Sequence, residues 1–259
     1  MRPIASFPRE TIGRIRGVLF DLDDTVLSHG VLTRSAFDAI WALHERKFRL
    51  VAVTGRPAAW GEIVARQWPI DAAVTENGAV AIVRSGRGLE RREGCDAAER
   101  VSRRARLDAL VLRMREDVPE AALTDDVHGR VSDMTWDIGE RVTLPESTVQ
   151  RVQATIRDSG ARTTRSSVHV HATFDSDDKA SGVVRLLGTM GDDVTAALSN
   201  YVFVGDSGND AACFAAFANT VGVANVRAHV GRMSVPPRYV TTEAMGAGFA
   251  ELARTLLAI

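Results

Sequence analysis

Lysine is the scarcest charged residue in this sequence. Only Lys47 and Lys179 are lysines among the 32 Lys and Arg residues of the 259-residue chain. Where arginine fills almost every basic position, a remaining lysine indicates a site that needs a compact ammonium group rather than a planar fork. Lys47, in the run Glu45-Arg46-Lys47, is typical of a solvated helix end. Lys179 is therefore the candidate for a functional site.

Cysteine is equally scarce. Cys95 and Cys213 are too few and too far apart for a disulfide framework or a zinc site, so we expect buried, inert thiols in a reducing cytosol. No apolar run reaches the length of a membrane span, and residues 1–17 lack the apolar core of a signal peptide. The net charge of -1 gives no sign of a general nucleic-acid or membrane-surface binder. We expect a soluble, cytoplasmic protein with neither kind of partner.

The remaining composition, 45% hydrophobic and 25% charged, is typical of a globular protein with a full core. Strand and helix patterns alternate early in the chain: strands are expected at 18–20, 48–53 and 71–75, and helices at 32–47 and 57–67. The alternation returns later, with helices at 178–190, 211–217 and 248–257 and strands at 201–204 and 220–223. This order indicates right-handed crossovers in a doubly wound parallel sheet, an α/β fold.

The middle of the chain has a different pattern. A hairpin is expected at 79–92, helices at 96–117 and 145–159, and strands at 121–126, 130–137, 162–164 and 168–174. This pattern predicts an inserted α+β module. We therefore divide the chain into a first core part (1–93), a cap domain (94–175) and a second core part (176–259).

Acidic residues follow the first predicted strand. Asp21 and Asp23 come directly after Val18-Leu19-Phe20, and residues two apart in such a turn can reach one small volume. They suit a nucleophile or metal ligand and a proton carrier. Other polar segments, 54–56, 76–78 and 205–210, also follow predicted strands, where open parallel sheets bind their ligands. Each segment alone is weak evidence for a catalytic site, because aspartates are also common in turns and helix caps. Their joint placement carries the prediction.

Phosphoryl transfer is the chemistry that this set suits. A phosphate monoester is a dianion, which a carboxylate repels unless a divalent cation lies between them. An all-oxygen site of the kind that Mg2+ prefers is available from five carboxylates, those of Asp21, Asp23, Asp24, Asp206 and Asp210. The Thr54 hydroxyl, the Gly55 N–H and the Lys179 ammonium group are then available to the phosphoryl oxygens.

These residues resemble, in the same order, the four motifs of the haloacid dehalogenase-like (HAD) hydrolase superfamily. The matching segments are Phe20-Asp21-Leu22-Asp23-Asp24-Thr25, Thr54-Gly55-Arg56, Lys179 and Gly205-Asp206-Ser207-Gly208-Asn209-Asp210. Further segments, 76–79, 221–225 and 240–248, resemble subfamily IIB. That subfamily carries a C2-type cap between its second and third motifs. It includes Cof-type sugar phosphatases, sucrose-phosphate phosphatase, mannosyl-3-phosphoglycerate phosphatase and phosphomannomutase.

The resemblance implies a role for each matched residue. Asp21 would be the nucleophile that becomes an aspartyl phosphate, and also a Mg2+ ligand. Asp23 would be the general acid and then the base, with its backbone carbonyl on the metal. The phosphoryl group would be held by Thr54, Gly55, Lys179 and Asn209. Asp206 would bind the metal directly, and Asp210 its waters or Lys179. Asp24 stands where many members have glycine, although aspartate is also common there.

The residues that contact the rest of the substrate, and those of the cap, are harder to assign. Candidate substrate contacts are Arg56, Asn77, Arg130 and Asp133. The group Arg130, Asp133, Trp136 and Asp137 would suit sugar hydroxyls, although half-buried strands often look the same. His169 and His171 alternate on one face of a predicted strand without a third metal ligand, so we expect them to face solvent. A solvated helix face is expected for Arg100, Arg103, Arg104 and Arg106.

The sequence therefore predicts a Mg2+-dependent phosphatase that acts on a small phosphorylated metabolite, with a sugar phosphate as the expected substrate. A monomer or weak homodimer is expected. The presence of Asp23 fits phosphatases and mutases rather than dehalogenases, so a phosphomutase is the first alternative. A receiver-like phosphoacceptor domain is a remote one, because its phosphoacceptor follows a later strand than its acidic pair and it has about half this length.

Overall fold

The computed structural model, which describes residues 1–166 and 168–258, is built around a nine-stranded sheet. Its first seven strands run parallel to their neighbours. In sheet order they are β1 (Arg2–Pro3), β14 (Tyr239–Val240), β13 (Asn219–Gly222), β12 (Tyr201–Gly205), β2 (Gly17–Phe20), β5 (Arg49–Val53) and β6 (Ala72–Thr75). The predicted hairpin, β7 (Val80–Ser85) and β8 (Gly88–Glu93), adds two antiparallel strands beside β6.

Helices cover both faces of this sheet because its strands are apolar on both sides. In β2, Val18 and Phe20 pack into one hydrophobic cluster and Leu19 into another. The first cluster includes residues of α2 (Arg34–Glu45) and α9 (Met245–Leu257). The second includes residues of α6 (Lys179–Thr189), α7 (Val194–Asn200) and α8 (Ala211–Ala216). Helix α3 (Ala58–Gln67) packs on β6 and β7, and α1 (Arg9–Ile12) is a single turn near the N-terminus. The doubly wound core is confirmed.

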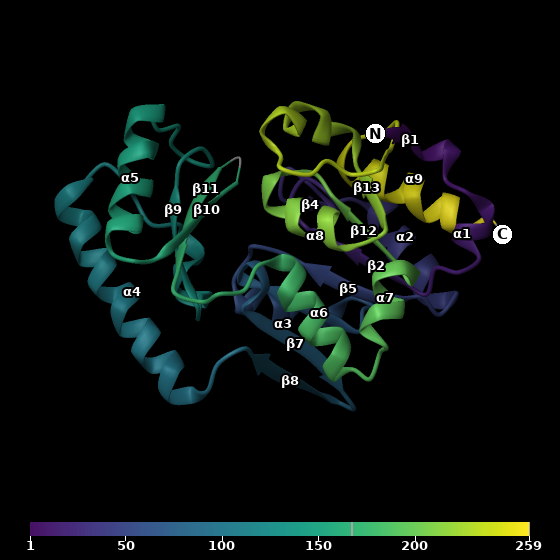
Figure 1. Cartoon of the computed structure of the whole chain (residues 1–259), viewed down its shortest axis with the longest axis horizontal. Helices are drawn as coiled ribbons and strands as arrows, with labels where there is room; N and C mark the ends of the chain where they lie inside the picture. Colours follow the sequence, from purple (N-terminus) through teal and green to yellow (C-terminus); the bar gives the residue numbers. More distant parts are fainter. Residues whose placement is uncertain (167, 259) are drawn as a thin grey trace.

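The cap lies beside the core as a separate α+β layer (Figure 1). Its strands form an antiparallel sheet in the order β10 (Arg162–Arg165), β11 (His169–Thr173) and β9 (Asp133–Asp137). Helices α4 (Ala97–Asp117) and α5 (Glu146–Asp158) share a hydrophobic core with this sheet, in which Leu107, Trp136 and Val152 are fully buried. The predicted fold class is therefore correct, whereas the exact boundaries 94–175 stay a prediction.

Two cap strands were predicted too long. Segment 121–126 forms only an isolated bridge, Leu123 to Trp136, before a 3-10 turn at Asp125–Gly129. Asp126 stabilises that turn by accepting hydrogen bonds from Thr124 and Arg130. Strand β9 starts at Asp133 rather than at residue 130, because the amides of residues 131–133 bond to a core carboxylate instead of a strand. Helix α7 was not predicted.

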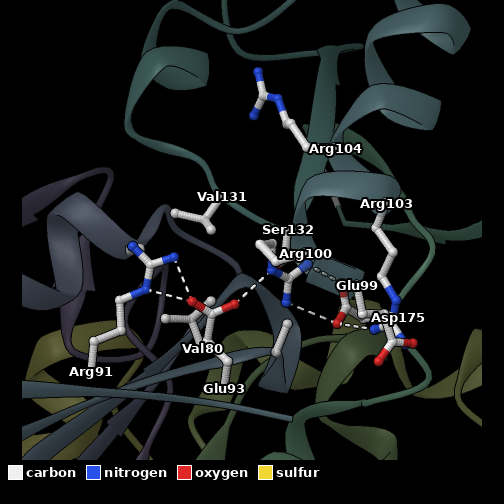
Figure 2. Close-up of polar contacts among 12 residues, drawn as sticks. Val80, Arg91, Glu93, Glu99, Arg100, Arg103, Arg104, Val131, Ser132 and Asp175 are labelled. Carbon is white, nitrogen blue, oxygen red and sulfur yellow. Dashed lines mark hydrogen bonds and ion pairs between the residues drawn. The ribbon is translucent and has the colours of Figure 1, made fainter. Parts of the chain in front are cut away.

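The arginines of α4 do not all form a solvated face. Arg100 donates to Glu93 at 2.6 Å and to both carboxylate oxygens of Asp175 at 2.7 and 3.0 Å, and Arg103 also donates to Asp175 (Figure 2). The Asp175 side chain is only 1% exposed. The chain leaves the core at Glu93 and returns to it at Asp175. The hinge cluster, which consists of Glu93, Arg100, Arg103 and Asp175, therefore joins both connections between core and cap. The predicted solvation is wrong for Arg100 and Arg103, which are ion-paired.

The carboxyl ends of the parallel strands form the edge that faces the cap. A small antiparallel ribbon, β3 (Leu27–Ser28) with β4 (Val31–Leu32), follows the Asp21 loop at this edge. Short 3-10 turns complete the fold at Ile4–Ser6, Glu76–Gly78, Gly208–Asp210, Ala224–Ala228 and Val230–Arg232. Among residues 1–166 and 168–258, no helix combines the length and the apolar character that crossing a membrane requires.

Candidate active site

Lys179 joins two carboxylates in the interior. Its ammonium group donates to Asp21 Oδ1 and to Asp210 Oδ1, each at 2.7 Å, and its side chain is 0% exposed. Asp21 follows β2, and its backbone N–H continues the parallel ladder by donating to Val204 O. Lys179 opens α6, which Asp178 caps by accepting from Ser181 N. The structure therefore places the rare lysine between two of the predicted site carboxylates, and its functional role stays a prediction.

Three buried carboxylates lie together at this edge. Asp21, Asp206 and Asp210 each offer an oxygen within 4.8 Å of the others. Asp210 folds back over the end of β12, where its Oδ2 accepts from Asp206 N at 2.9 Å and Ser207 N at 3.1 Å. A Cβ on Gly205 would lie 2.3 Å from that oxygen, so the loop requires glycine there.

The electrostatics of this cluster favour a bound cation. Burial raises the pKa of Asp21 to about 7 despite the attraction of Lys179. Burial, together with Asp21 and Asp210, raises the pKa of Asp206 to about 9. Burial alone would lower the pKa of Lys179, but Asp21 and Asp210 raise it instead. When all three carboxylates are ionised, they face one ammonium group, and the net charge of the cluster is balanced by a divalent cation that prefers oxygen ligands.

Asp23 and Asp24 stand apart from the three carboxylates. The Asp23 side chain is 50% exposed and is held by Arg56, whose Nε lies 2.9 Å from Oδ1 and 3.0 Å from Oδ2. Asp24 has φ 52°, a left-handed conformation that glycine adopts most easily and aspartate tolerates. Its Oδ1 accepts from His29 N at 3.2 Å. Asp24 therefore shapes the loop, and its carboxylate is not part of the cluster.

The Thr54-Gly55-Arg56 loop follows β5 beside this cluster. Thr54 is fully buried, and its Oγ1 accepts from Arg56 N at 3.1 Å. Asn209 donates to Asn77 Oδ1 at 3.3 Å, and a Cβ on Gly55 would lie 3.2 Å from the same oxygen. The structure thus brings together Gly55 and Asn209, two of the predicted phosphate-binding residues, and Asn77, a predicted substrate contact.

A cavity of about 690 Å3 opens over the site, between the core and the cap. Predicted site residues on its wall are Asp21, Asp23, Gly55, Arg56, Arg130, Asp206 and Asn209. The other predicted site residues do not line it; these are Thr54, Asn77, Asp133, Lys179 and Asp210. The cap contributes Asp125, Asp126, Gly139, Glu140, Ser166, Val168, His169 and His171 to the wall. Arg56 lies over the Trp60 ring at 4.1 Å, and both residues line the cavity.

His171 does not face solvent as predicted. It is 4% exposed, and its Nδ1 lies 3.0 Å from Asp133 Oδ2 and 2.9 Å from Thr135 Oγ1. Asp133 also accepts from Arg130 Nη1, at 3.0 and 3.1 Å. Burial alone would raise the pKa of Asp133, but Arg130 and His171 lower it. The carboxylate partner of His171 was missed because it lies 38 residues away along the chain, on the neighbouring strand β9.

The other half of the predicted sugar-binding group serves the cap itself. Trp136 is part of the hydrophobic core of the cap. Asp137 accepts from the backbone N–H groups of residues 139, 140 and 141 and so stabilises a turn. Neither residue lines the cavity. His169, in contrast, lines it and lies 2.8 Å from Glu140.

Asn225 was not among the predicted site residues, although its segment carried part of the resemblance. Its Nδ2 donates to Asp206 Oδ2 at 3.0 Å and to Asp24 O at 2.9 Å, and its Oδ1 accepts from Met245 N at 3.0 Å. It follows the end of β13, so the strand-end rule that identified the other loops also applied here. Asn225 thus joins the Asp206 loop to the Asp21 loop.

Comparison with known proteins supports the resemblance. Residues 18–93 match the family model described as haloacid dehalogenase-like hydrolase. No curated protein sequence matches the chain. Among solved structures, a Thermoplasma acidophilum protein has a TM-score of 0.74 at 14% identity, over 95% of this chain and 99% of that one.

Two further solved structures are similar over their lengths. The sucrose-phosphatase of Synechocystis, in complex with sucrose and phosphate, has a TM-score of 0.66 at 17% identity over 93% of this chain and 98% of its own. A phosphatase of the HAD superfamily from Bacteroides thetaiotaomicron has a TM-score of 0.65 at 18% identity over 98% of each chain. At these identities the structures establish a shared fold.

Proposed function

We propose that this haloacid dehalogenase-like hydrolase is a Mg2+-dependent phosphatase that hydrolyses a small phosphorylated metabolite through an aspartyl-phosphate intermediate. The observation that carries the proposal is the position of Asp21. Its carboxylate lies on the wall of a cavity between core and cap, 2.7 Å from a buried lysine and within the three-carboxylate cluster. A nucleophile, a charge partner and a cation site are thus within one small volume.

The metal ligands in this proposal are the carboxylates of Asp21 and Asp206 and the backbone carbonyl of Asp23. Asp210 acts on metal-bound waters or on Lys179. When bound, Mg2+ supplies positive charge that keeps the carboxylates ionised and neutralises the phosphoryl oxygens. Asn225 holds Asp206 in place through the 3.0 Å hydrogen bond to its Oδ2. The identity of the cation is part of the proposal.

The chain's own groups carry the chemical steps. The Asp21 carboxylate attacks phosphorus while Asp23 gives its proton to the departing ester oxygen, which leaves as an alcohol. The Asp23 carboxylate then takes a proton from water, the water oxygen attacks the same phosphorus, and the bond to Asp21 breaks. Lys179, Thr54, Gly55 and Asn209 hold the phosphoryl group throughout. This division of labour is that of a positioned nucleophile and a general acid and base.

A sugar phosphate is the substrate class that the cap wall favours. The cap side of the cavity presents the carboxylates of Asp125, Asp126 and Glu140, the imidazole of His169 and the guanidinium group of Arg130, which is paired with Asp126. Carboxylates accept hydrogen bonds from hydroxyl groups and repel further anions, so a polyhydroxylated body with one phosphate fits this wall best. The similar Synechocystis enzyme was solved with sucrose and phosphate.

A phosphate-release screen tests the function. The purified chain is incubated with Mg2+ and a panel of phosphorylated sugars, nucleotides and cofactors, with Asp21→Asn and an EDTA-treated sample as controls. We expect release from at least one sugar phosphate, absent in both controls. If no compound of the panel releases phosphate, the proposed phosphatase activity is contradicted. Conversion of a hexose 1-phosphate to its 6-phosphate without release would establish the phosphomutase instead.

A further inference from the structure

Glu76 is a buried core carboxylate with an unusual set of partners. It lies in the loop after β6, has φ 49° and is 3% exposed. A left-handed backbone at a non-glycine residue is strained, so the surroundings must hold it there. The proposed mechanism does not use Glu76, and it does not line the active-site cavity.

The partners of Glu76 come mainly from the cap. Its Oε2 accepts from Val131 N at 3.1 Å, Ser132 N at 2.5 Å, Ser132 Oγ at 2.6 Å and Asp133 N at 3.2 Å. Its Oε1 accepts from Val131 N at 3.0 Å and from Ala58 N, in the first turn of α3, at 2.9 Å. Hydrogen bonds from N–H groups to a buried carboxylate are stronger than neutral ones. One core side chain therefore holds three consecutive amides of the cap.

Arg130 precedes the segment 131–133 and contacts the phosphate loop, which is Thr54-Gly55-Arg56. Its Nη1 donates to Gly55 O at 3.0 Å, and its Nε and Nη2 donate to Asp126 at 3.1 Å. Gly55 is flanked by Thr54 and Arg56, so this contact fixes the loop that the proposed function assigns to the phosphoryl group. The position of Arg130 depends on where the core holds residues 131–133.

We infer that Glu76 is a positioning residue, a latch that fixes residues 131–133 of the cap on the core and thereby places Arg130 on the Gly55 carbonyl. The inference rests on the proposed function for its effect on catalysis, but the latch itself is a physical contact. Without the latch, the cap segment separates from the phosphate loop more often. Binding of the ground state and of the transition state then weakens together, so KM rises while kcat changes little.

Glu76→Gln tests the latch. An amide keeps the shape of the side chain but turns one acceptor into a donor that faces the amides of residues 131–133. Glu62→Gln, an exposed change on the neighbouring helix α3, is the matched control. Hydrogen–deuterium exchange of the full chain with Mg2+ should show the amides of residues 131–133 exchanging at least about tenfold faster in Glu76→Gln only.

Kinetics with p-nitrophenyl phosphate give the second readout. We expect KM to rise at least about fivefold in Glu76→Gln with kcat within about threefold of wild type, and Glu76→Asp to recover part of the loss. Ser132→Ala removes only the 2.6 Å hydroxyl bond and gives a milder form of the same test if Glu76→Gln does not fold. Unchanged exchange at residues 131–133 in the folded variants overturns the latch. A fall in kcat alone, with KM unchanged, also overturns the positioning role.

The two proposals fail in different ways. If wild-type protein hydrolyses no phosphate ester, the proposed function is wrong, yet the exchange experiment still decides whether Glu76 holds the cap. If wild type is active and exchange at residues 131–133 does not respond to Glu76, only the latch is wrong.

Discussion

The guanidinium group of Arg56 holds both carboxylate oxygens of Asp23. Nε lies 2.9 Å from Oδ1 and 3.0 Å from Oδ2, and Nη2 lies 2.5 Å from Oδ1. The same guanidinium lies over the ring of Trp60. The residue that we propose as proton carrier is therefore oriented by an arginine of the phosphate loop, and a dianionic substrate would compete with Asp23 for that arginine.

Arg56→Lys is expected to lower kcat/KM for p-nitrophenyl phosphate by roughly tenfold, because an ammonium group cannot hold both oxygens of Asp23 or stack as a plane. The melting temperature should change little. Arg66→Lys, an exposed change on helix α3, which follows the Arg56 loop, is the control and should leave both quantities unchanged. Wild-type kinetics in Arg56→Lys would contradict the orienting role.

Asp21→Asn is expected to abolish turnover, by about 10³-fold or more, because an amide is not a competent nucleophile. Circular dichroism and thermal unfolding should show an intact fold. Mass spectrometry of wild type quenched during turnover should show an added phosphoryl group on the peptide that contains Asp21, and Asp21→Asn should show none. Full activity in this variant would disprove the nucleophile assignment.

The carboxylate cluster predicts a pH-dependent stability in EDTA. The pKa of Asp21 is raised from 3.8 to about 7, and that of Asp206 from 3.8 to about 9. The folded state therefore binds more protons than the unfolded chain between pH 3.8 and about pH 9. Stability is therefore greatest at low pH within this window and falls as pH rises through the folded pKa values. The melting temperature in EDTA should be several degrees lower at pH 8.5 than at pH 5.5, given roughly 2–4 °C per kcal/mol.

Mg2+ should reverse that trend, because it binds the ionised carboxylates and so stabilises the folded state most at high pH. Thermal unfolding with and without Mg2+ at both pH values measures the effect. Asp206→Asn should reduce both the pH dependence in EDTA and the response to Mg2+. An equal response to Mg2+ in wild type and Asp206→Asn would contradict the proposed cation site.

Asp175→Asn is expected to destabilise the protein by about 2 kcal/mol, because it leaves Arg100 and Arg103 without their shared buried carboxylate. The value is below that of a fully buried pair because Arg100 is 11% exposed. Asp108→Asn breaks the exposed pair with Arg104 on the same helix and should cost no more than about 0.5 kcal/mol. Urea unfolding measures both, and equal losses would show that the hinge cluster is unimportant.

The core could be predicted from the sequence because its signals are local. Strands β2, β5 and β12 are short apolar runs, and a polar loop follows each directly, so Asp21, Thr54 and Asp206 could be assigned to one edge without any structure. The scarcity of lysine also singled out Lys179, which the structure places between Asp21 and Asp210. These inferences needed only the rule that parallel strands end at the same edge of the sheet.

The cap could not be predicted at the same level because its contacts are distant in sequence. His171 is buried by Asp133 on a neighbouring strand, and Arg100 is paired with Asp175 from the far end of the cap. Strand β9 starts late because Glu76, in the core, binds the amides before it. Solvated and ion-paired arginines have the same local pattern, so only the fold separates them.

The scarcity of lysine also decides where the folded protein can be acylated. Lys179 is fully buried, whereas Lys47 is exposed and stands just before β5, at the amino ends of the parallel strands. Amine-reactive dyes or beads will therefore react with one side-chain amine on the native surface, at the opposite edge of the sheet from the loops of Asp21, Thr54 and Asp206. The molecule can be tethered through the Lys47 side chain with its cavity left open.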